Sequence, residues 1–135
     1  MCRHFDLDLS EIALHEDCGL LAWSPLTRGI LSGKYLNEAR PAGARLTLET
    51  RPEHRVGDQV DNATKKYVEL ANRYNLDPCQ MALAFVNSRP FVSSTLIGAT
   101  TMDQLRSNID SISVTLSEEV LKEIDLVRRS HPMPF

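Results

Sequence analysis

Apolar residues along this chain alternate between helical spacing and short continuous runs. Helical spacing occupies residues 8–17 and 59–74, the segment from Pro78 to Pro90, residues 101 to about 112, and the segment after Ser117. Two runs, Leu20–Trp23 and Ser94–Ile97, have the length of strands. The first run lacks alternation, which is typical of a strand buried on both faces of a parallel sheet. Residues 37–58 show little periodicity, and a loop of this length is usually functional or disordered.

Capping residues indicate where these helices begin and end. Asp77 precedes a proline at the first helical position, and Thr101 with Gln104 has the spacing of a capping box. Ser117 precedes the last apolar face, and Gly19 is expected to stop the first helix. The predicted order is helix, strand, long loop, helix, helix, strand, helix, helix.

This order favours an α/β architecture. Two parallel strands do not make a stable sheet, since three or more are normally needed. Several helices also have apolar faces that no predicted strand would cover. The 135 residues have the size of one domain, but the pattern indicates a part of a larger α/β fold.

Composition narrows the function classes. Apolar residues make up 42% and charged residues 24% of the chain, and 15 basic residues stand against 18 acidic ones. This balance indicates neither a nucleic-acid nor a membrane-surface binder. No apolar run reaches the length of a membrane span, and the first residues lack the core of a signal peptide. We therefore expect a cytoplasmic protein.

No metal site or catalytic nucleophile is expected. The histidines and the three cysteines are scattered without ligand spacing. Cys79 lies in an apolar helical stretch, which favours a small buried side chain over a reactive thiol. No nucleophile with a base at a recognisable spacing is present.

Two segments could bind an anionic, planar ligand. Residues 96–101, LIGATT, join a strand to a capped helix through a glycine, and free backbone N–H groups there favour phosphate. An ordinary helix cap after a turn explains the same residues. Trp23 ends the first strand and could stack on a planar ring, with Ser24 and Lys34 nearby. A core tryptophan beside a turn explains that pattern as well.

The long loop adds a third candidate. It contains Arg40, Arg45, Arg51 and Arg55, and arginine side chains suit phosphate oxygens. The alternative is a solvated loop in which neighbouring acidic residues balance the charge.

Four segments resemble the aldo/keto reductases, in family order and at family spacing. Residues 23–35, WSPLTRGILSGKY, resemble the segment of strand seven, and residues 95–109, TLIGATTMDQLRSNI, resemble the cofactor segment of strand eight. Residues 80–85, QMALAF, and 116–124, LSEEVLKEI, resemble the helix before the last strand and the closing helix. The branch looks like the bacterial reductases related to potassium-channel β-subunits, and the resemblance covers nearly all of residues 1–135.

The resemblance implies the C-terminal portion of a (β/α)₈ TIM barrel that binds NADP(H) and reduces aldehydes or ketones. Trp23 would stack on the nicotinamide, and Gly98 and Thr100 would meet the 2′-phosphate. Gln104 and Asn108 would contact the adenosine, although Ser107 stands where the family often has glutamate. The remaining implied cofactor residues lie along the ribose and phosphates: Ser24, Pro25, Leu26, Thr27, Lys34 and the loop residue Arg51.

The resemblance also implies that the catalytic tetrad of Asp, Tyr, Lys and His precedes this segment, so no residue of this chain is expected to be catalytic. The expected partners are the nicotinamide cofactor and a small carbonyl substrate, with the missing N-terminal half as a possible requirement. An inactive nucleotide-sensing or interaction module derived from the family is the alternative. An unrelated small α/β domain would have to explain the ordered motif matches.

Overall fold

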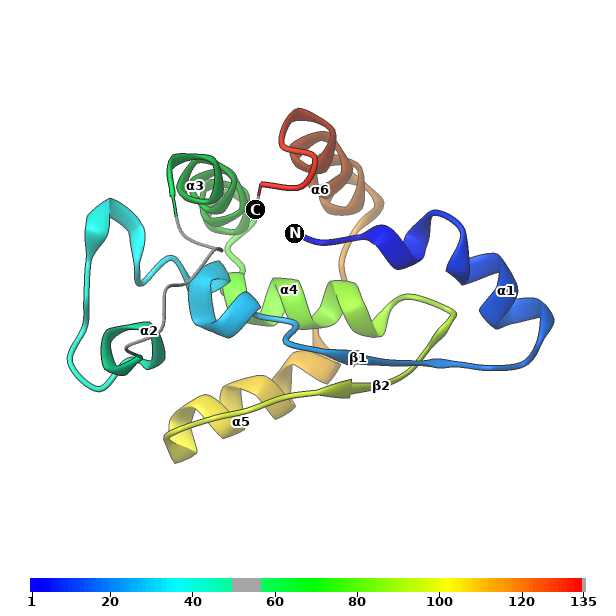
Figure 1. The fold of residues 1–135 in the computed structure, drawn as a ribbon, viewed down its shortest axis with the longest axis horizontal. Coiled ribbons are helices and arrows are strands. Elements are labelled where there is room, and N and C mark those ends of the chain that lie inside the picture. Colours follow the sequence, from blue (N-terminus) through cyan, green and yellow to red (C-terminus); the bar gives the residue numbers. More distant parts are fainter. Residues whose placement is uncertain (50–56, 135) are drawn as a thin grey trace.

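The computed structural model describes residues 1–49 and 57–134 (Figure 1). Six α-helices, two strands and four short 3-10 helices (η) are present in these residues. In chain order they are η1 His4–Asp6, α1 Leu9–His15, β1 Leu20–Trp23, η2 Thr27–Ser32, η3 Leu36–Glu38, α2 Arg45–Leu48, α3 Asp58–Arg73, α4 Pro78–Asn87, β2 Val92–Leu96, α5 Met102–Asp110, η4 Ser111–Ser113 and α6 Glu118–Ser130. The predicted order of the main helices and strands is confirmed.

The two strands pair in parallel, and their carboxyl ends lie at one edge of the sheet. Leu21 faces Ser94 and Trp23 faces Leu96, with an irregularity in register after Leu20. A Cβ added at Gly19 would clash with the Ser93 hydroxyl, so a glycine lets β1 approach β2 there without a rearrangement of Ser93. The prediction that Gly19 stops the first helix is wrong, because α1 already ends at His15.

Helix caps follow the sequence closely. The Asp77 carboxylate accepts hydrogen bonds from the N–H groups of Cys79 and Gln80 at 2.8 and 2.9 Å. The Ser117 hydroxyl accepts a hydrogen bond from the Val120 N–H at 3.3 Å. These contacts satisfy N–H groups that have no acceptor within the helix.

The main core lies between α4 and the pair α3 and α6. Figure 1 shows α4 between this pair and the two strands. The helical spacing predicted for 59–74 is confirmed, since its apolar residues are buried on one face of α3. The main core cluster comprises Leu31, Tyr67, Leu70, Ala71, Met81, Val120 and Ile124. A second cluster joins η2 to the long loop and comprises Ile30, Tyr35, Ala44, Leu46 and Val60.

The long loop is more ordered than its sequence indicates. Residues 37–58 are predicted as irregular, yet they contain the short helix α2, and Leu46 of α2 is buried. Four helical residues are too few to produce a periodic apolar pattern, so this helix could not be predicted. Leu46 is buried in a cluster with Ile30 and Tyr35, which explains why the long loop packs against residues 23–35.

The first strand is not buried on both faces. Leu21 and Trp23 are 58% and 69% exposed, whereas Leu20 and Ala22 on the other face are partly buried. The prediction of a fully buried strand is therefore wrong for this chain. The apolar face of α1 is also largely exposed at Leu9 and Ile12. This agrees with the expectation that some apolar helix faces have no strand to cover them.

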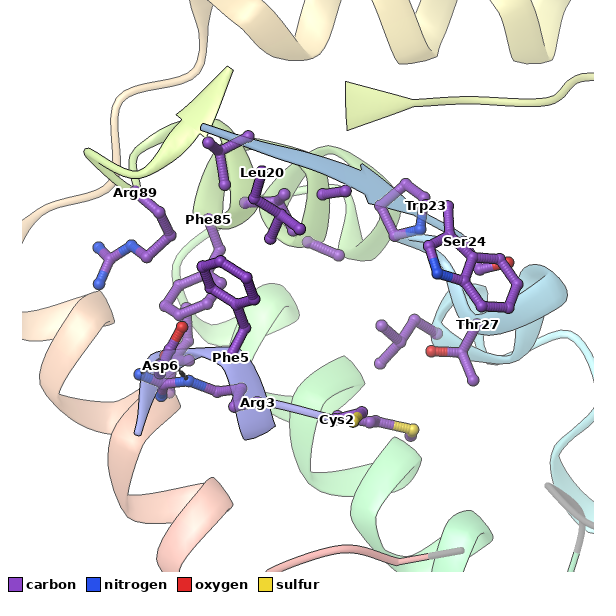
Figure 2. A pocket seen from close by; sticks show the side chains of 18 of the residues that line it. Cys2, Arg3, Phe5, Asp6, Leu20, Trp23, Ser24, Thr27, Phe85 and Arg89 are labelled. Atoms are coloured by element: carbon purple, nitrogen blue, oxygen red, sulfur yellow. Dashed lines mark hydrogen bonds and ion pairs between the residues drawn. The ribbon is translucent and has the colours of Figure 1, made fainter. Parts of the chain in front are cut away.

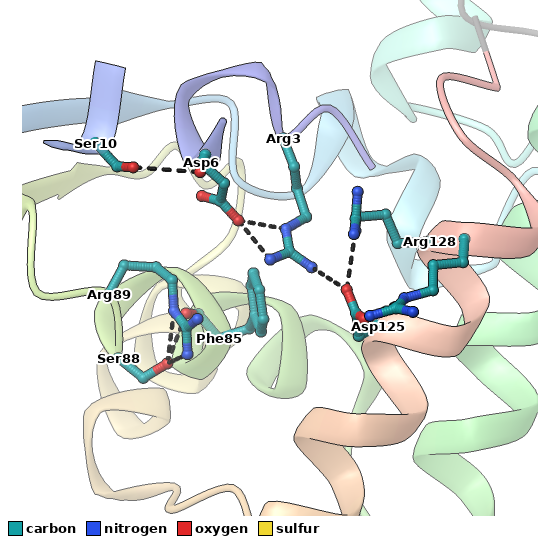
Figure 3. A network of polar contacts seen from close by, with 9 residues as sticks. Arg3, Asp6, Ser10, Phe85, Ser88, Arg89, Asp125 and Arg128 are labelled. Carbon is teal, nitrogen blue, oxygen red and sulfur yellow. Dashed lines mark hydrogen bonds and ion pairs between the residues drawn. The ribbon is translucent and has the colours of Figure 1, made fainter. Parts of the chain in front are cut away.

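A polar network joins the N-terminal segment to the last helix (Figure 3). Arg3 pairs with Asp6 at 2.5 Å and also contacts Asp125 of α6 at 3.5 Å. Asp125 accepts further hydrogen bonds from Arg128 and Arg129 at 3.0 and 2.6 Å. Three arginine side chains therefore meet one carboxylate. The hydrogen bonds from Arg128, the larger contributor, and from Arg129 lower the pKa of Asp125.

No helix in the described part of the chain is both long and apolar enough to cross a membrane.

Candidate functional site

The two predicted ligand segments follow the carboxyl ends of the two strands. Residues 24–35 continue from β1, and residues 97–101 continue from β2 into α5. Because Trp23 is paired with Leu96 in a parallel register, both segments leave the sheet at the same edge. The strand order and pairing thus gather residues that are more than seventy positions apart in the sequence.

The backbone after β1 adopts an unusual conformation. Ser24, Thr27 and Arg28 have φ angles of 54°, 49° and 58°, and Gly29 has 91°. A β-branched residue such as Thr27 rarely adopts positive φ. Such strained residues cluster at functional sites, where surrounding structure holds them in place.

A cavity of about 480 Å³ lies beside β1 (Figure 2). Trp23, Ser24, Pro25 and Thr27 line one end of it, so the structure brings four predicted cofactor residues together. Leu26, between them in sequence, is absent from this lining and precedes η2. Figure 2 shows Phe5, Phe85 and Arg89 at the other end.

The segment between β2 and α5 is exposed and lies outside this cavity. Gly98 and Thr100 are exposed, as is Gln104 in the first turn of α5. The capping-box prediction is confirmed on one side, because the Thr101 hydroxyl accepts a hydrogen bond from the Gln104 N–H at 3.2 Å. On the other side, the Gln104 amide oxygen accepts hydrogen bonds from the Thr100 N–H at 3.0 Å and the Thr100 hydroxyl at 3.1 Å. Gln104 is therefore hydrogen-bonded to both residues that precede α5, Thr100 and Thr101.

Asn108 lies deeper than the other predicted residues. It is 8% exposed, and its carbonyl oxygen accepts a hydrogen bond from the Ser111 hydroxyl at 2.6 Å. The Gln80 side chain of α4 donates a hydrogen bond to the Ser107 carbonyl oxygen at 3.1 Å, which fixes this turn of α5. The structure therefore places Asn108 in a rigid turn, one helix turn beyond Gln104.

Lys34 lies against η2 and its neighbours. Its ammonium nitrogen is 5.2 Å from the centroid of the Tyr35 ring. Cys79 in the first turn of α4 is close enough to feel this charge, which opposes a rise in its pKa. The pKa of the Cys79 thiol is raised to about 11. Burial is the largest cause, and the negative charge of the nearby Asp77 carboxylate is the second. The expectation that Cys79 is an unreactive small side chain agrees with this raised pKa and with its partial burial.

The predicted loop arginines and Arg28 differ in their positions and contacts. Arg45 is exposed at the start of α2, whereas Arg51 and Arg55 lie outside the described residues. Arg28, which was considered only as part of the 23–29 motif, forms an ion pair with Glu49 at the end of α2. Sequence reasoning also missed Tyr35, whose hydroxyl oxygen accepts a hydrogen bond from the Leu46 N–H at 3.2 Å. The only sequence signal for Tyr35 is its position next to Lys34.

Among the described residues, no group of three or more His, Cys, Asp or Glu side chains could hold a metal ion.

Comparison with known proteins identifies the family. The model of the aldo/keto reductase family matches residues 1–129. Protein tas of Escherichia coli is 52% identical over 132 residues, covering 98% of this chain and 38% of that protein. A putative voltage-gated potassium channel subunit beta of Schizosaccharomyces pombe is 33% identical over 141 residues, covering 96% of this chain and 40% of that protein. The predicted family and branch are confirmed.

The fold comparison agrees. The structure of a glycerol dehydrogenase from Gluconobacter oxydans matches with a TM-score of 0.75 at 21% identity, covering 99% of this chain and 41% of that chain. This chain therefore has the fold of part of that structure. It spans about two fifths of the length of the relatives and of the structure that it matches.

Proposed function

The chain belongs to the aldo/keto reductase family, and we propose that it forms the C-terminal, NADP(H)-binding portion of a reductase that converts aldehydes or ketones to alcohols. The observation that carries this proposal is the pairing of Trp23 with Leu96. It places an exposed aromatic ring and a capped helix start at one edge of the sheet. An aromatic ring suits the planar part of such a ligand, and a helix start suits its phosphate.

The geometry suits the loops of a (β/α)₈ barrel. We assign β1 and β2 to strands seven and eight, because each is followed by a candidate anion-binding segment at its carboxyl end. In such barrels a phosphate site is frequently built by the loops after these two strands. The exposed side chain of Leu21 would then be covered by the rest of the barrel.

The residues fit a nicotinamide cofactor, which when bound supplies a hydride. Trp23 would stack on the nicotinamide ring, for which its side chain is 69% exposed. Ser24, Pro25 and Thr27, together with Leu26, would follow the ribose and pyrophosphate, and three of these four residues line the cavity next to Trp23. The Lys34 ammonium would lie near a phosphate, where it neutralises charge.

The 2′-phosphate would bind at the start of α5. Gly98 and Thr100 are exposed there, and the first-turn N–H groups of α5 have no acceptor within the helix. The Thr100 N–H is already bonded to Gln104, so an entering phosphate must use the neighbouring N–H groups or displace the Gln104 amide. Gln104 and Asn108 would contact the adenosine.

A loop arginine would complete this phosphate site, and we assign Arg51. The Arg51→Ala variant should lose about tenfold of the NADPH preference over NADH, since a charge-assisted hydrogen bond contributes about 1.5–3 kcal/mol. Arg45→Ala serves as the matched control, because Arg45 is an exposed arginine of the same loop. If the Arg45→Ala variant loses the preference and Arg51→Ala keeps it, the assignment of Arg51 is wrong.

Supplying the part of the barrel that these 135 residues do not cover tests the function. The chain is co-produced with the N-terminal part of Protein tas of Escherichia coli that it does not cover, and NADPH oxidation is followed with a panel of aldehydes. We expect turnover in the mixture and none in either part alone. Loss of turnover in Trp23→Ala with retention in Trp23→Phe would support stacking. Turnover by this chain alone, or none in a stably assembled mixture, would contradict the proposal.

A further inference from the structure

The Lys34 side chain lies beside the Tyr35 ring and close to Gly29. Its ammonium nitrogen lies 5.2 Å from the centroid of the Tyr35 ring, within the range of a cation–π contact. In the part of the chain that the structure describes, Lys34 forms no ion pair with an acidic side chain. Its charge is therefore oriented without being neutralised.

Gly29 forms the other side of this arrangement. A Cβ added at Gly29 would lie 3.1 Å from Lys34 Cε and 3.2 Å from Lys34 Nζ. These distances are tighter than ordinary packing, so the end of the lysine side chain would have to shift by a few tenths of an ångström if residue 29 carried a side chain. Gly29 also has a φ of 91°, which a residue with a side chain rarely adopts.

Tyr35 itself is anchored on both sides. It is 4% exposed and packs in the second core cluster with Ile30 and Leu46. Its hydroxyl oxygen accepts the Leu46 N–H, a first-turn group of α2 with no acceptor within that helix. A ring fixed in this way has little freedom, so the cation that it holds has a defined place.

We propose that Tyr35 is a positioning residue for Lys34, whose ring holds the Lys34 ammonium at a defined place toward an anionic ligand while its hydroxyl fixes α2. The two functions are carried by different parts of one side chain. Tyr35→Phe should remove only the α2 contact, and Tyr35→Leu should remove both. The ligand part of this inference rests on the proposed function, in which Lys34 lies near a cofactor phosphate.

Lysine labelling tests the ring contact without any cofactor. The full chain is reductively methylated, and the rate at each lysine is measured by mass spectrometry. We expect slow labelling of Lys34 in wild type and in Tyr35→Phe, and faster labelling in Tyr35→Leu. Lys66 and Lys122, which are 56% and 75% exposed, serve as internal controls with unchanged rates. An unchanged Lys34 rate in Tyr35→Leu, or a wild-type rate equal to that of the controls, would overturn the proposal.

Hydrogen exchange tests the second contact. The Leu46 amide should exchange faster in Tyr35→Phe, because the phenol oxygen that accepts it is gone. Protection of Leu46 equal to wild type in this variant would show that the hydroxyl does not fix α2.

A double-mutant cycle tests the link to the ligand. NADPH is titrated into wild type, Tyr35→Leu, Lys34→Ala and the double variant. We expect Tyr35→Leu to weaken binding about three- to tenfold and to add almost nothing in the Lys34→Ala background. An equal loss in both backgrounds would overturn positioning in favour of general destabilisation. If wild type binds no NADPH, the proposed function fails, while the labelling result still decides the contact between Tyr35 and Lys34.

Discussion

Trp23 and Leu96 are paired at the carboxyl ends of two parallel strands, and this relationship positions both candidate ligand segments. Trp23 exposes its ring at the point where the strained segment 24–29 begins. Leu96 precedes the turn that leads to the capped start of α5. A ligand that is planar at one end and anionic at the other would therefore contact residues from both halves of the chain.

Two helix caps of similar chemistry differ in their relation to this site. Thr101 caps α5 beside the proposed phosphate site, and Ser117 caps α6 away from it. Thr101→Ala and Ser117→Ala should each lower the free energy of unfolding by about 1 kcal/mol, measured by urea denaturation. Only Thr101→Ala should also weaken NADPH binding. Equal weakening by both variants would point to a general loss of stability.

Cys79 should be slow to react with thiol reagents. Its pKa is raised to about 11, chiefly by burial, so at about pH 8 only about one molecule in a thousand carries the thiolate. Alkylation followed by mass spectrometry should modify the exposed Cys2 and Cys18 first. Unfolding in urea should remove the difference. Rapid modification of Cys79 in the folded chain would contradict its partial burial and raised pKa.

The Asp125 network should contribute pH-dependent stability. Hydrogen bonds from Arg128 and Arg129 lower the pKa of Asp125 in the folded chain. The stabilisation is therefore present above the unfolded pKa of about 3.9 and is lost as the pH falls through the lower folded value. Asp125→Asn should cost about 0.5–1 kcal/mol at neutral pH.

The cost of Asp125→Asn should shrink toward zero in acid, as measured by urea denaturation at several pH values. Asp103→Asn is a matched control, because the contact of Asp103 with Arg106 is long, at 3.4 Å, and both side chains are exposed. A cost of Asp125→Asn that is independent of pH would contradict the role of its charge.

The exposed face of the strands should promote self-association of the isolated chain. Leu21 and Trp23 are exposed on β1 beside Leu96 on β2, and uncovered apolar strands favour association. Light scattering should increase with concentration and fall in Leu21→Lys. Leu126→Lys is the control, because Leu126 is similarly exposed but lies on α6. A monodisperse chain at all concentrations would contradict this expectation.

The sequence predicted most of the fold because its signals are local. Asp77, Thr101 and Ser117 marked three helix starts through hydrogen bonds to N–H groups within three residues. The apolar face of α3 was equally clear. The exposure of Leu21 could not be predicted, because the pattern of a buried strand is the same whether or not its partners are present.

The grouping of some candidate site residues could be predicted from the sequence, while their roles stay a prediction. The cluster of Trp23, Ser24, Pro25 and Thr27 lies in consecutive sequence, so a motif could identify it. The contacts of Tyr35 with Lys34 and of Arg28 with Glu49 depend on how α2 packs back on η2. No local pattern specifies that packing.

Titration of the chain with NADPH and NADH, followed through Trp23, tests the central claim most directly. Trp23 is the only tryptophan in the sequence, so no other tryptophan contributes to the fluorescence change at the proposed stacking site. The account predicts saturable quenching by both cofactors, with NADPH binding more tightly because the 2′-phosphate meets the start of α5. Absence of saturable quenching, or equal affinity for the two cofactors, would contradict it.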